Sequence, residues 1–266
     1  MYKKRILILL VLVILAVNLP VKYIQAEASV IDSSNLNKGI ITINYKPENN
    51  ITTKVMIQKD KKSYTYTLSD NNVFPLQLGD GQYTISILEQ VKENKYRQVE
   101  KETVQLKLSE ENAVYLQSIQ LIYWDSDMDA VKKAAKLTKN VKSDEDKIAA
   151  IYDYIVSNIR YDKVKASKVK SDYIPSIDDI FEDSKGICYD YSALFAAMLR
   201  SVGIPTKLVM GYKNDISEYH AWNQVYLEAE DKWVTIDTTY DAAFYDGKSS
   251  NDWIKDSGEY SIKKLY

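Results

Sequence analysis

Two residue types suited to nucleophilic and acid–base chemistry occur once each in this chain of 266 residues, as Cys188 and His220. A cysteine attacks a carbonyl carbon as its thiolate, and a neighbouring imidazole can take the thiol proton and return it to a leaving group. A carboxylate on the far ring nitrogen, here Asp237, would fix the tautomer and support the imidazolium. These three residues would support acyl transfer through a thioester.

Each of the three residues also has an inert interpretation. A single cysteine on an amphipathic helix is more often a core residue than a nucleophile. A single histidine in a strand is usually structural, and an aspartate after an apolar strand often only starts a turn. Composition does not decide between these interpretations, whereas the order and context of the three residues favour chemistry.

The segments around the three residues predict where each side chain lies. Cys188 begins a run of apolar residues with helical spacing, which Gly203 ends. A helix N-terminus favours a thiolate, and Gly186 would permit the tight turn that leads into this helix. Three strands are predicted to follow, over 206–212, 220–227 and 233–237. His220 and Asp237 would then meet if their strands are neighbours.

Helical patterns also precede this region. Ser143 is predicted to cap a helix, with Asp146 in a weak capping-box role, and four isoleucines from Ile148 to Ile159 form one stripe. A further helix is predicted over 128–137. Helices followed by an antiparallel sheet indicate the α+β class for this half of the chain.

Residues from about 39 to 108 alternate between apolar and polar with period two, which predicts half-buried strands. Turn residues such as those at 47–50, 70–72 and 79–81 separate the strands at the intervals of a small antiparallel sandwich. No catalytic constellation occurs in this region. We therefore predict a β-sandwich-like module at 29–115 and a catalytic domain at 116–266.

The first residues predict export. Basic residues at 3–5 precede an apolar run of twelve residues at 6–17, and Ala26-Glu27-Ala28 follows as a cleavage motif. The alternative is a permanent anchor, but a membrane-spanning helix needs about 20 apolar residues. We expect a signal peptide at 1–28, cleavage after Ala28, and a secreted protein in the extracellular space or on the cell wall, without a membrane segment after cleavage.

Removing residues 1–28 takes away four basic residues and one acidic residue, leaving 31 basic against 36 acidic and a net charge of −5. This acidic balance argues against a nucleic-acid partner. A single cysteine excludes disulfides within the chain. The alternating Asp125, Asp127 and Asp129 are interpreted as a helix N-terminal cap region, so no metal and no cofactor is expected.

From about residue 145 to 240 the chain resembles the transglutaminase-like superfamily. Any one of the shared motifs is a weak signal, whereas their order and spacing together are specific. The motifs are Tyr154-Ile155-Val156-Ser157-Asn158-Ile159-Arg160-Tyr161-Asp162, Gly186-Ile187-Cys188-Tyr189-Asp190-Tyr191, Leu199-Arg200-Ser201-Val202-Gly203-Ile204-Pro205-Thr206, His220-Ala221-Trp222 and Trp233-Val234-Thr235-Ile236-Asp237-Thr238-Thr239. The resemblance implies a papain-like or transglutaminase-like core, in which helices pack on an antiparallel sheet.

The resemblance also implies roles for individual residues. Cys188, His220 and Asp237 would form the catalytic triad, and Tyr161 would donate to the oxyanion together with the backbone N–H of Cys188. Two further aromatic residues, Tyr189 and Trp222, are candidates for the substrate cleft. Packing around the sheet is the other interpretation of Trp222. Many members have proline at the position of Thr238 and tryptophan at that of Tyr189, but neither change removes a reacting group.

We therefore expect a secreted thiol enzyme that acts on peptide or amide bonds, with a peptide or protein substrate and either water or a primary amine as acceptor. The alternative is a catalytically silent binding or scaffold protein that retains the core. A papain-like protease is a third interpretation, but the residues around Cys188 do not match its signature and His220 follows after only 32 residues.

Overall fold

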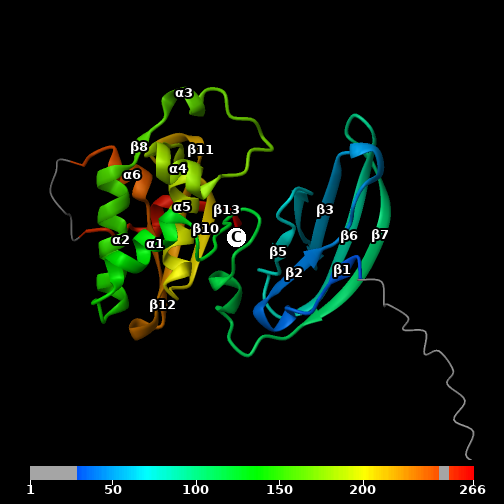
Figure 1. Ribbon diagram of the computed structural model, residues 1–266, viewed down its shortest axis with the longest axis horizontal. Coiled ribbons are helices and arrows are strands. Elements are labelled where there is room, and N and C mark those ends of the chain that lie inside the picture. The colour runs from blue at the N-terminus through cyan, green and yellow to red at the C-terminus, as the bar shows by residue number, and fades with distance from the viewer. Residues whose placement is uncertain (1–28, 246–251) are drawn as a thin grey trace, which may run out of the picture.

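The computed structural model describes residues 29–245 and 252–266, so the predicted signal peptide lies outside the described part of the chain. Figure 1 shows two lobes, which we call the β lobe (residues 31–106) and the helix–sheet lobe (residues 129–245 and 252–266). The segment between them contains the 3₁₀ helix η3 (Ala113–Leu116). This arrangement separates the strands of the N-terminal part from the helices that follow.

Two antiparallel sheets form the β lobe, with strand orders β4-β3-β6-β7 and β1-β2-β5. Alternate residues of its strands, such as Ile85 and Ile87, are fully buried. The strands are β1 (Ile31–Asp32), β2 (Ile40–Ile43), β3 (Thr53–Lys59), β4 (Lys62–Thr67), β5 (Val73–Pro75), β6 (Gly81–Lys92) and β7 (Lys95–Leu106), with 3₁₀ helices η1 (Leu36–Lys38) and η2 (Glu48–Asn50). The predicted all-β, sandwich-like character of this part is confirmed.

Helices cover an antiparallel sheet of order β12-β11-β10-β13 in the helix–sheet lobe. Its elements are α1 (Asp129–Thr138), α2 (Asp144–Asn158), β8 (Arg160–Tyr161), α3 (Lys163–Ala166), α4 (Ile177–Asp183), β9 (Lys185–Gly186), α5 (Cys188–Ser201), β10 (Thr206–Lys213), β11 (Ile216–Leu227), η4 (Glu228–Glu230), β12 (Lys232–Ile236), α6 (Thr238–Ala242), η5 (Ser257–Glu259) and β13 (Tyr260–Leu265). The predicted α+β class is confirmed.

Local sequence explains why these elements begin where they do. The Ser143 hydroxyl accepts a hydrogen bond from Asp146 N at 3.1 Å, as expected of an N-cap, and α2 follows directly. Helix α5 is almost entirely apolar and buried, including Leu194 and Phe195 at 0% exposure. Because α5 lies against both β10 and β11, its N-terminal residue Cys188 is held at the end of the sheet where β11 carries His220.

Strand β13 was not predicted from the sequence. It pairs with β10 at the edge of the sheet, with Lys213 opposite Tyr260 and Val209 opposite Leu265. Its pattern is weak because three of its six residues are exposed lysines or a serine, and Ile262 is 43% exposed. Tertiary pairing with β10 therefore determines this strand more than its own periodicity does.

The two lobes are joined by side chains that satisfy backbone groups of the opposite lobe. Gln77 of the β lobe donates through Nε2 to Leu265 O at 3.3 Å, and the ring of Tyr64 contacts that of Tyr266 edge-on at 5.4 Å. Arg200, which is 2% exposed, donates to three carbonyls, those of Gln117, Thr206 and Tyr266. These buried bonds hold the lobes and their connecting segment together.

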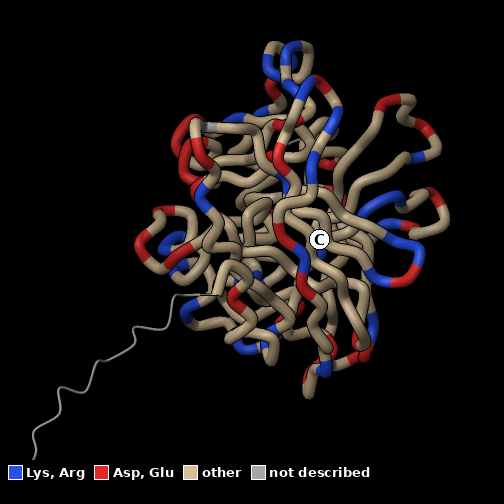
Figure 2. The backbone as a smooth tube through the Cα atoms, turned by 90° about the vertical axis from the view of Figure 1, so that its right-hand side faces the viewer, with Lys and Arg blue, Asp and Glu red and all other residues tan. Residues whose placement is uncertain are grey.

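Charged residues of both signs are interspersed along the surface loops, as Figure 2 shows for the face toward the viewer. Among the residues that the structure describes, no helix has the length and apolarity required to cross a membrane. The acidic residues predicted to lie near a helix start do so, because Asp129 opens the first turn of α1 and Asp125 Oδ1 accepts from Asp127 N.

Candidate active site

The N-terminus of α5 presents Cys188. The thiol is partly buried and is the first residue of a helix of 14 residues. Unpaired backbone N–H groups and the helix dipole favour negative charge at this position. The location predicted for the cysteine, at the start of a helix, is therefore the one observed.

A short parallel pairing brings Tyr161 to the same place. Strands β8 and β9 pair so that Tyr161 lies opposite Gly186, two residues before Cys188. Burial, with a smaller contribution from the nearby Cys188, raises the pKa of Tyr161 above its usual value. The phenol thus keeps its proton and remains a hydrogen-bond donor, as an oxyanion role requires.

His220 and Asp237 meet at the end of the sheet. The His220 ring, 6% exposed, bonds through Nε2 to Oδ2 of the fully buried Asp237 at 2.7 Å. Asp237 follows β12 and caps α6, because its Oδ1 accepts from Tyr240 N at 3.0 Å. Nε2 is engaged by the carboxylate, so the ring interacts with Cys188 through Nδ1. The structure thus brings together the three predicted triad residues.

The surroundings of His220 favour its protonated form. Burial lowers its pKa, but the hydrogen bonds to Asp237 and Cys188 and their charges outweigh burial and raise the pKa from 6.5 to about 9. The imidazole is therefore protonated at neutral pH. An imidazolium next to the Cys188 sulfur is ready to donate a proton to a leaving group.

This pKa predicts a basic limb in the pH profile of activity. We expect kcat/KM to fall by about tenfold per pH unit above pH 9, because the general acid is then lost. The free energy of unfolding should also fall at high pH. Because the pKa of His220 is higher in the folded protein, its protonation stabilises the fold fully below pH 6.5, and this stabilisation disappears as pH rises through about 9. Turnover and thermal unfolding between pH 6 and 10.5 measure both effects. His220→Gln should remove the His220 contribution to this pH dependence and leave that of other buried groups such as Lys207, whose pKa burial lowers to about 8. A wild-type profile flat to pH 10.5 contradicts the assignment.

Tyr260 of β13 is a site residue that the sequence did not indicate. Its hydroxyl donates to Asp237 Oδ2 at 3.2 Å, the same oxygen that bonds His220. The Asp237 carboxylate therefore receives three hydrogen bonds, counting that from Tyr240 N. The only sequence signal would have been the alternation of Tyr260 and Ile262, which is too short to predict a strand.

A second unpredicted residue, Asp190, positions the start of α5. The Asp190 carboxylate is fully buried and accepts from Ile187 N at 2.8 Å, Tyr173 OH at 2.6 Å and Lys165 Nζ at 2.6 Å. It lies two residues after Cys188, so it ties the turn that carries the thiol to the segment that follows β8. Its pattern, an aspartate at the third position of a helix, could have suggested an N-terminal capping role.

Gly186 is needed for a reason other than the tight turn predicted for it. Its φ is not in the left-handed region. Instead, a Cβ at this position would lie 2.5 Å from Cβ of Asp190, closer than any ordinary contact. The absence of a side chain at Gly186 thus allows the buried Asp190 to approach the backbone.

Gly186→Ala should consequently weaken both the fold and the site. We expect a loss of about 1–3 kcal/mol in unfolding free energy, because Asp190 is packed on all sides. Displacement of Cys188 should lower turnover by about 10- to 100-fold. Thermal unfolding and turnover test this, with Gly258→Ala as control, where the nearest atom is a carboxylate oxygen at 3.2 Å. Equal behaviour of the two variants would contradict the role given to Gly186.

A cavity of about 450 Å³ opens onto the triad. Its walls combine two of the candidate triad residues with apolar side chains and acidic groups, and they include Tyr161, Cys188, Glu218, His220, Tyr240 and Phe244. Phe244 is 72% exposed. Such a mixture of convergent polar groups and apolar surface is typical of a small-molecule or peptide site.

The two residues proposed for the cleft lie in different places. Tyr189 is half-buried and lines a separate cavity between the lobes, where its ring contacts that of Tyr173 at 6.1 Å. Trp222 is 1% exposed and stacks on His220 with ring centroids 6.2 Å apart. The tryptophan therefore lies behind the imidazole and does not form a wall that a substrate can touch, which corrects that expectation. Packing around the sheet, the other interpretation of Trp222, is what the structure has.

Among the described residues, no group of three or more histidine, cysteine, aspartate or glutamate side chains is arranged to hold a metal ion. The acidic residues near the triad have other partners. Asp215 pairs with Lys213 at 2.6 Å and accepts from Tyr240 OH at 2.9 Å, and Lys213 also pairs with Glu259 at 3.1 Å.

Residues 131–238 match the family model of the transglutaminase-like superfamily. Over 127 residues, 40% of this chain and 17% of the relative, the chain is 32% identical to the uncharacterized protein YebA of Bacillus subtilis strain 168. Over 80 residues, 25% of this chain and 12% of the relative, it is 34% identical to a protein-glutamine gamma-glutamyltransferase of Pseudomonas aeruginosa strain PAO1.

One solved structure, described as a putative cysteine protease from Cytophaga hutchinsonii, aligns with 81% of this chain and 84% of its own, at 16% identity and a TM-score of 0.43. The chain spans less than a fifth of the length of either curated relative. The region that the family model matches contains α5, β10, β11 and β12, and with them Cys188, His220 and Asp237. Residues 131–238 of this chain are therefore similar to the transglutaminase-like superfamily, whose family model they match.

Proposed function

We propose that this protein is a secreted thiol enzyme that transfers or hydrolyses acyl groups at peptide or amide bonds, with Cys188 as nucleophile. The observation that carries the proposal is the 2.7 Å bond between buried His220 and Asp237, with the other ring nitrogen directed to Cys188. A silent scaffold would not need an imidazole bonded to a buried carboxylate beside a thiol at a helix N-terminus.

In the first half-reaction the Cys188 thiolate attacks the carbonyl carbon of the amide and a C–S bond forms. The oxygen becomes negatively charged, and the Cys188 N–H and the Tyr161 hydroxyl are the donors in reach of the cavity. The C–N bond then breaks while the His220 imidazolium gives its proton to the leaving nitrogen. Ammonia or an amine departs, and the acyl group remains on sulfur as a thioester.

In the second half-reaction neutral His220 removes a proton from the acceptor, which attacks the thioester carbon. The C–S bond breaks, the thiolate returns and His220 is again protonated. Water as acceptor gives hydrolysis, and a primary amine gives a new amide. Asp237 stabilises the imidazolium throughout, and it does not itself need to take up a proton.

Proteins or peptides outside the cell, including those of the cell wall, are the substrates we propose. Similarity to a protein-glutamine gamma-glutamyltransferase favours glutamine side chains as the acyl donor. The basic residues, apolar run and Ala26-Glu27-Ala28 motif favour export, for which a mature chain starting at Ser29 in the culture medium is the test.

Mass spectrometry of the protein incubated with a glutamine-containing peptide and a primary amine tests the reaction itself. Gain of the amine with loss of ammonia would demonstrate transfer, replacement of ammonia by water would demonstrate deamidation, and a shorter peptide would demonstrate proteolysis. Each of these outcomes should disappear in Cys188→Ala. A peptide that stays unchanged under all conditions, with a thiol that no alkylating reagent labels, would favour the scaffold interpretation.

A further inference from the structure

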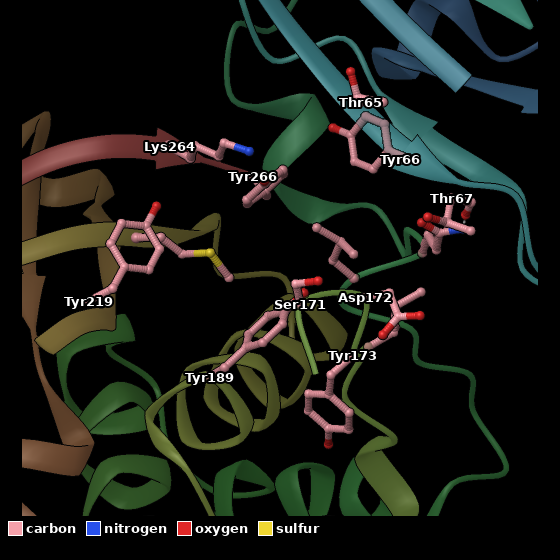
Figure 3. A pocket seen from close by; sticks show the side chains of 14 residues that line it. Thr65, Tyr66, Thr67, Ser171, Asp172, Tyr173, Tyr189, Tyr219, Lys264 and Tyr266 are labelled. Atoms are coloured by element: carbon pink, nitrogen blue, oxygen red, sulfur yellow. Dashed lines mark hydrogen bonds between the residues drawn. The ribbon is translucent and has the colours of Figure 1, made fainter. Parts of the chain in front are cut away.

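A second cavity, of about 260 Å³, lies between the two lobes. Figure 3 shows side chains from both lobes directed into it, with Thr65 and Tyr66 from the β lobe facing Tyr189, Tyr219 and Lys264 from the helix–sheet lobe. We call it the interlobe cavity. Five tyrosines line it together with Leu121, Ile174 and Met210, and the remaining lining residues, such as Ser171 and Asp172, are polar or charged.

The interlobe cavity adjoins the triad through two neighbouring residues. Tyr189 directly follows Cys188, and Tyr219 directly precedes His220. Tyr219 lines both the interlobe cavity and the cavity that opens onto the triad. It is 47% exposed, so its ring forms a wall shared by the two spaces. A substrate chain that occupies the catalytic cavity can therefore continue into the interlobe cavity past Tyr219.

The β lobe contributes an unpaired strand edge to this cavity. Strand β4 is the last strand of its sheet. Leu68 N donates to Thr53 O, which fixes the alternation of hydrogen bonds between β4 and β3. Tyr66 and Tyr64 therefore bond to β3 through their backbone groups, whereas the residues between them direct their N–H and C=O groups away from β3. Thr65 is one of these outward residues and lines the cavity. Thr67, the next one, already uses its carbonyl to accept from Gln120 Nε2 at 2.8 Å.

The free edge of β13, in the helix–sheet lobe, is bonded by side chains of the β lobe at Leu265. Strand β13 has β10 on one side only, and on its free side Leu265 N donates to Tyr64 OH at 3.3 Å while Leu265 O accepts from Gln77 Nε2 at 3.3 Å. Side chains of the β lobe thus cover the edge of β13 at Leu265. The edge of β4 at Thr65 is left open toward the interlobe cavity, in the part of the chain that the structure describes.

We propose that the substrate is a polypeptide that binds in extended form along the edge of β4, exchanges backbone hydrogen bonds with Thr65, and places one large apolar or aromatic side chain in the interlobe cavity. Unpaired N–H and C=O groups on a strand edge recognise the backbone of another strand. Tyrosine rings and Met210 provide the apolar surface for the side chain. The β lobe then selects substrates for the thiol beside it.

This inference rests on the proposed thiol chemistry, and the test separates the two. The full chain is alkylated with iodoacetamide at pH 7, with and without unfolded casein as the polypeptide probe. Labelling at Cys188 without casein reports on the thiolate. Slower labelling with casein reports on polypeptide binding, and its dependence on casein concentration yields an apparent dissociation constant.

Thr65→Pro removes the outward N–H, and proline is tolerated at such positions on an edge strand. Ser63→Pro is the matched control, since Ser63 is the other outward residue of β4 on the hairpin side but does not line the cavity. We expect the dissociation constant for casein to rise about three- to tenfold in Thr65→Pro, the worth of one backbone hydrogen bond, and to stay within twofold in Ser63→Pro. Thermal unfolding verifies that both variants fold.

Hydrogen exchange provides a second readout that needs no substitution at β4. In Cys188→Ala, residues 62–68 should gain protection when casein is added, whereas β7 at the opposite edge of the same sheet should not. Unchanged casein affinity in Thr65→Pro, or no added protection at 62–68, overturns strand addition even if Cys188 is reactive. Protection of Cys188 by a soluble glycan and not by casein overturns it as well.

Discussion

Cys188→Ala is expected to lower turnover by a factor on the order of 10⁴ or more, because it removes the only atom that can carry the acyl group. The chain has no second cysteine to replace it. Since the side chain is only partly buried, the unfolding free energy should change by less than about 1 kcal/mol. Turnover, thermal unfolding and iodoacetamide labelling measure the three quantities on one preparation.

The single cysteine makes the labelling result unambiguous. Wild-type protein should take up one label, and Cys188→Ala should take up none. His220→Gln serves as the companion variant, because it keeps the thiol but removes the imidazolium and should therefore be labelled more slowly at pH 7. Full turnover in Cys188→Ala would sink the mechanism, whatever the labelling pattern.

Asp237→Asn is the second large effect, with an expected loss in kcat of about 10²- to 10⁴-fold. Both oxygens of Asp237 accept hydrogen bonds: Oδ1 from Tyr240 N, and Oδ2 from His220 Nε2 and Tyr260 OH. Asparagine has only one acceptor oxygen. The backbone N–H of Tyr240 cannot become an acceptor, so the asparagine oxygen should face it and the NH₂ group should face His220.

An NH₂ group directed at Nε2 forces the proton of neutral His220 onto Nδ1, the nitrogen that must accept the thiol proton. The base is then blocked while the fold is retained. Asp256→Asn is the matched control, because Asp256 caps η5 by accepting from Gly258 N but lies outside the triad cavity. Comparable turnover in Asp237→Asn and wild type would contradict the role of Asp237. An equal loss of turnover in Asp256→Asn would show that losing a helix cap, and not a change at His220, causes the effect.

The local part of the site was predictable because its causes lie within a few residues of one another. Ser143 caps α2 through the N–H three residues on, and the apolar spacing after Cys188 specifies the buried face of α5. The strands that carry His220 and precede Asp237 were also predicted from their own segments. In each case a short-range pattern is sufficient to determine the element.

Other parts of the site depend on partners far away in the chain. Tyr260 reaches Asp237 only because β13 pairs with β10, and its own strand has an exposed, lysine-rich pattern. Asp190 is buried because Lys165 and Tyr173 come to it from the segment after β8. Such contacts leave no periodic trace in the sequence, since a hydrogen bond between distant residues constrains neither spacing nor composition.

The amino-acid sequence by itself determined the candidate triad, since Cys188 and His220 are each unique and Asp237 follows at the end of an apolar strand. It also determined the α+β order of helices and strands, which arises from local periodicity and capping. Only the tertiary structure decided that the cavity between the lobes lies next to the cavity at the triad, with Tyr219 in the walls of both and the open strand edge at Thr65 in the wall of the first. That meeting depends on which strand edges are covered and which remain free, a property of packed sheets that no single segment contains.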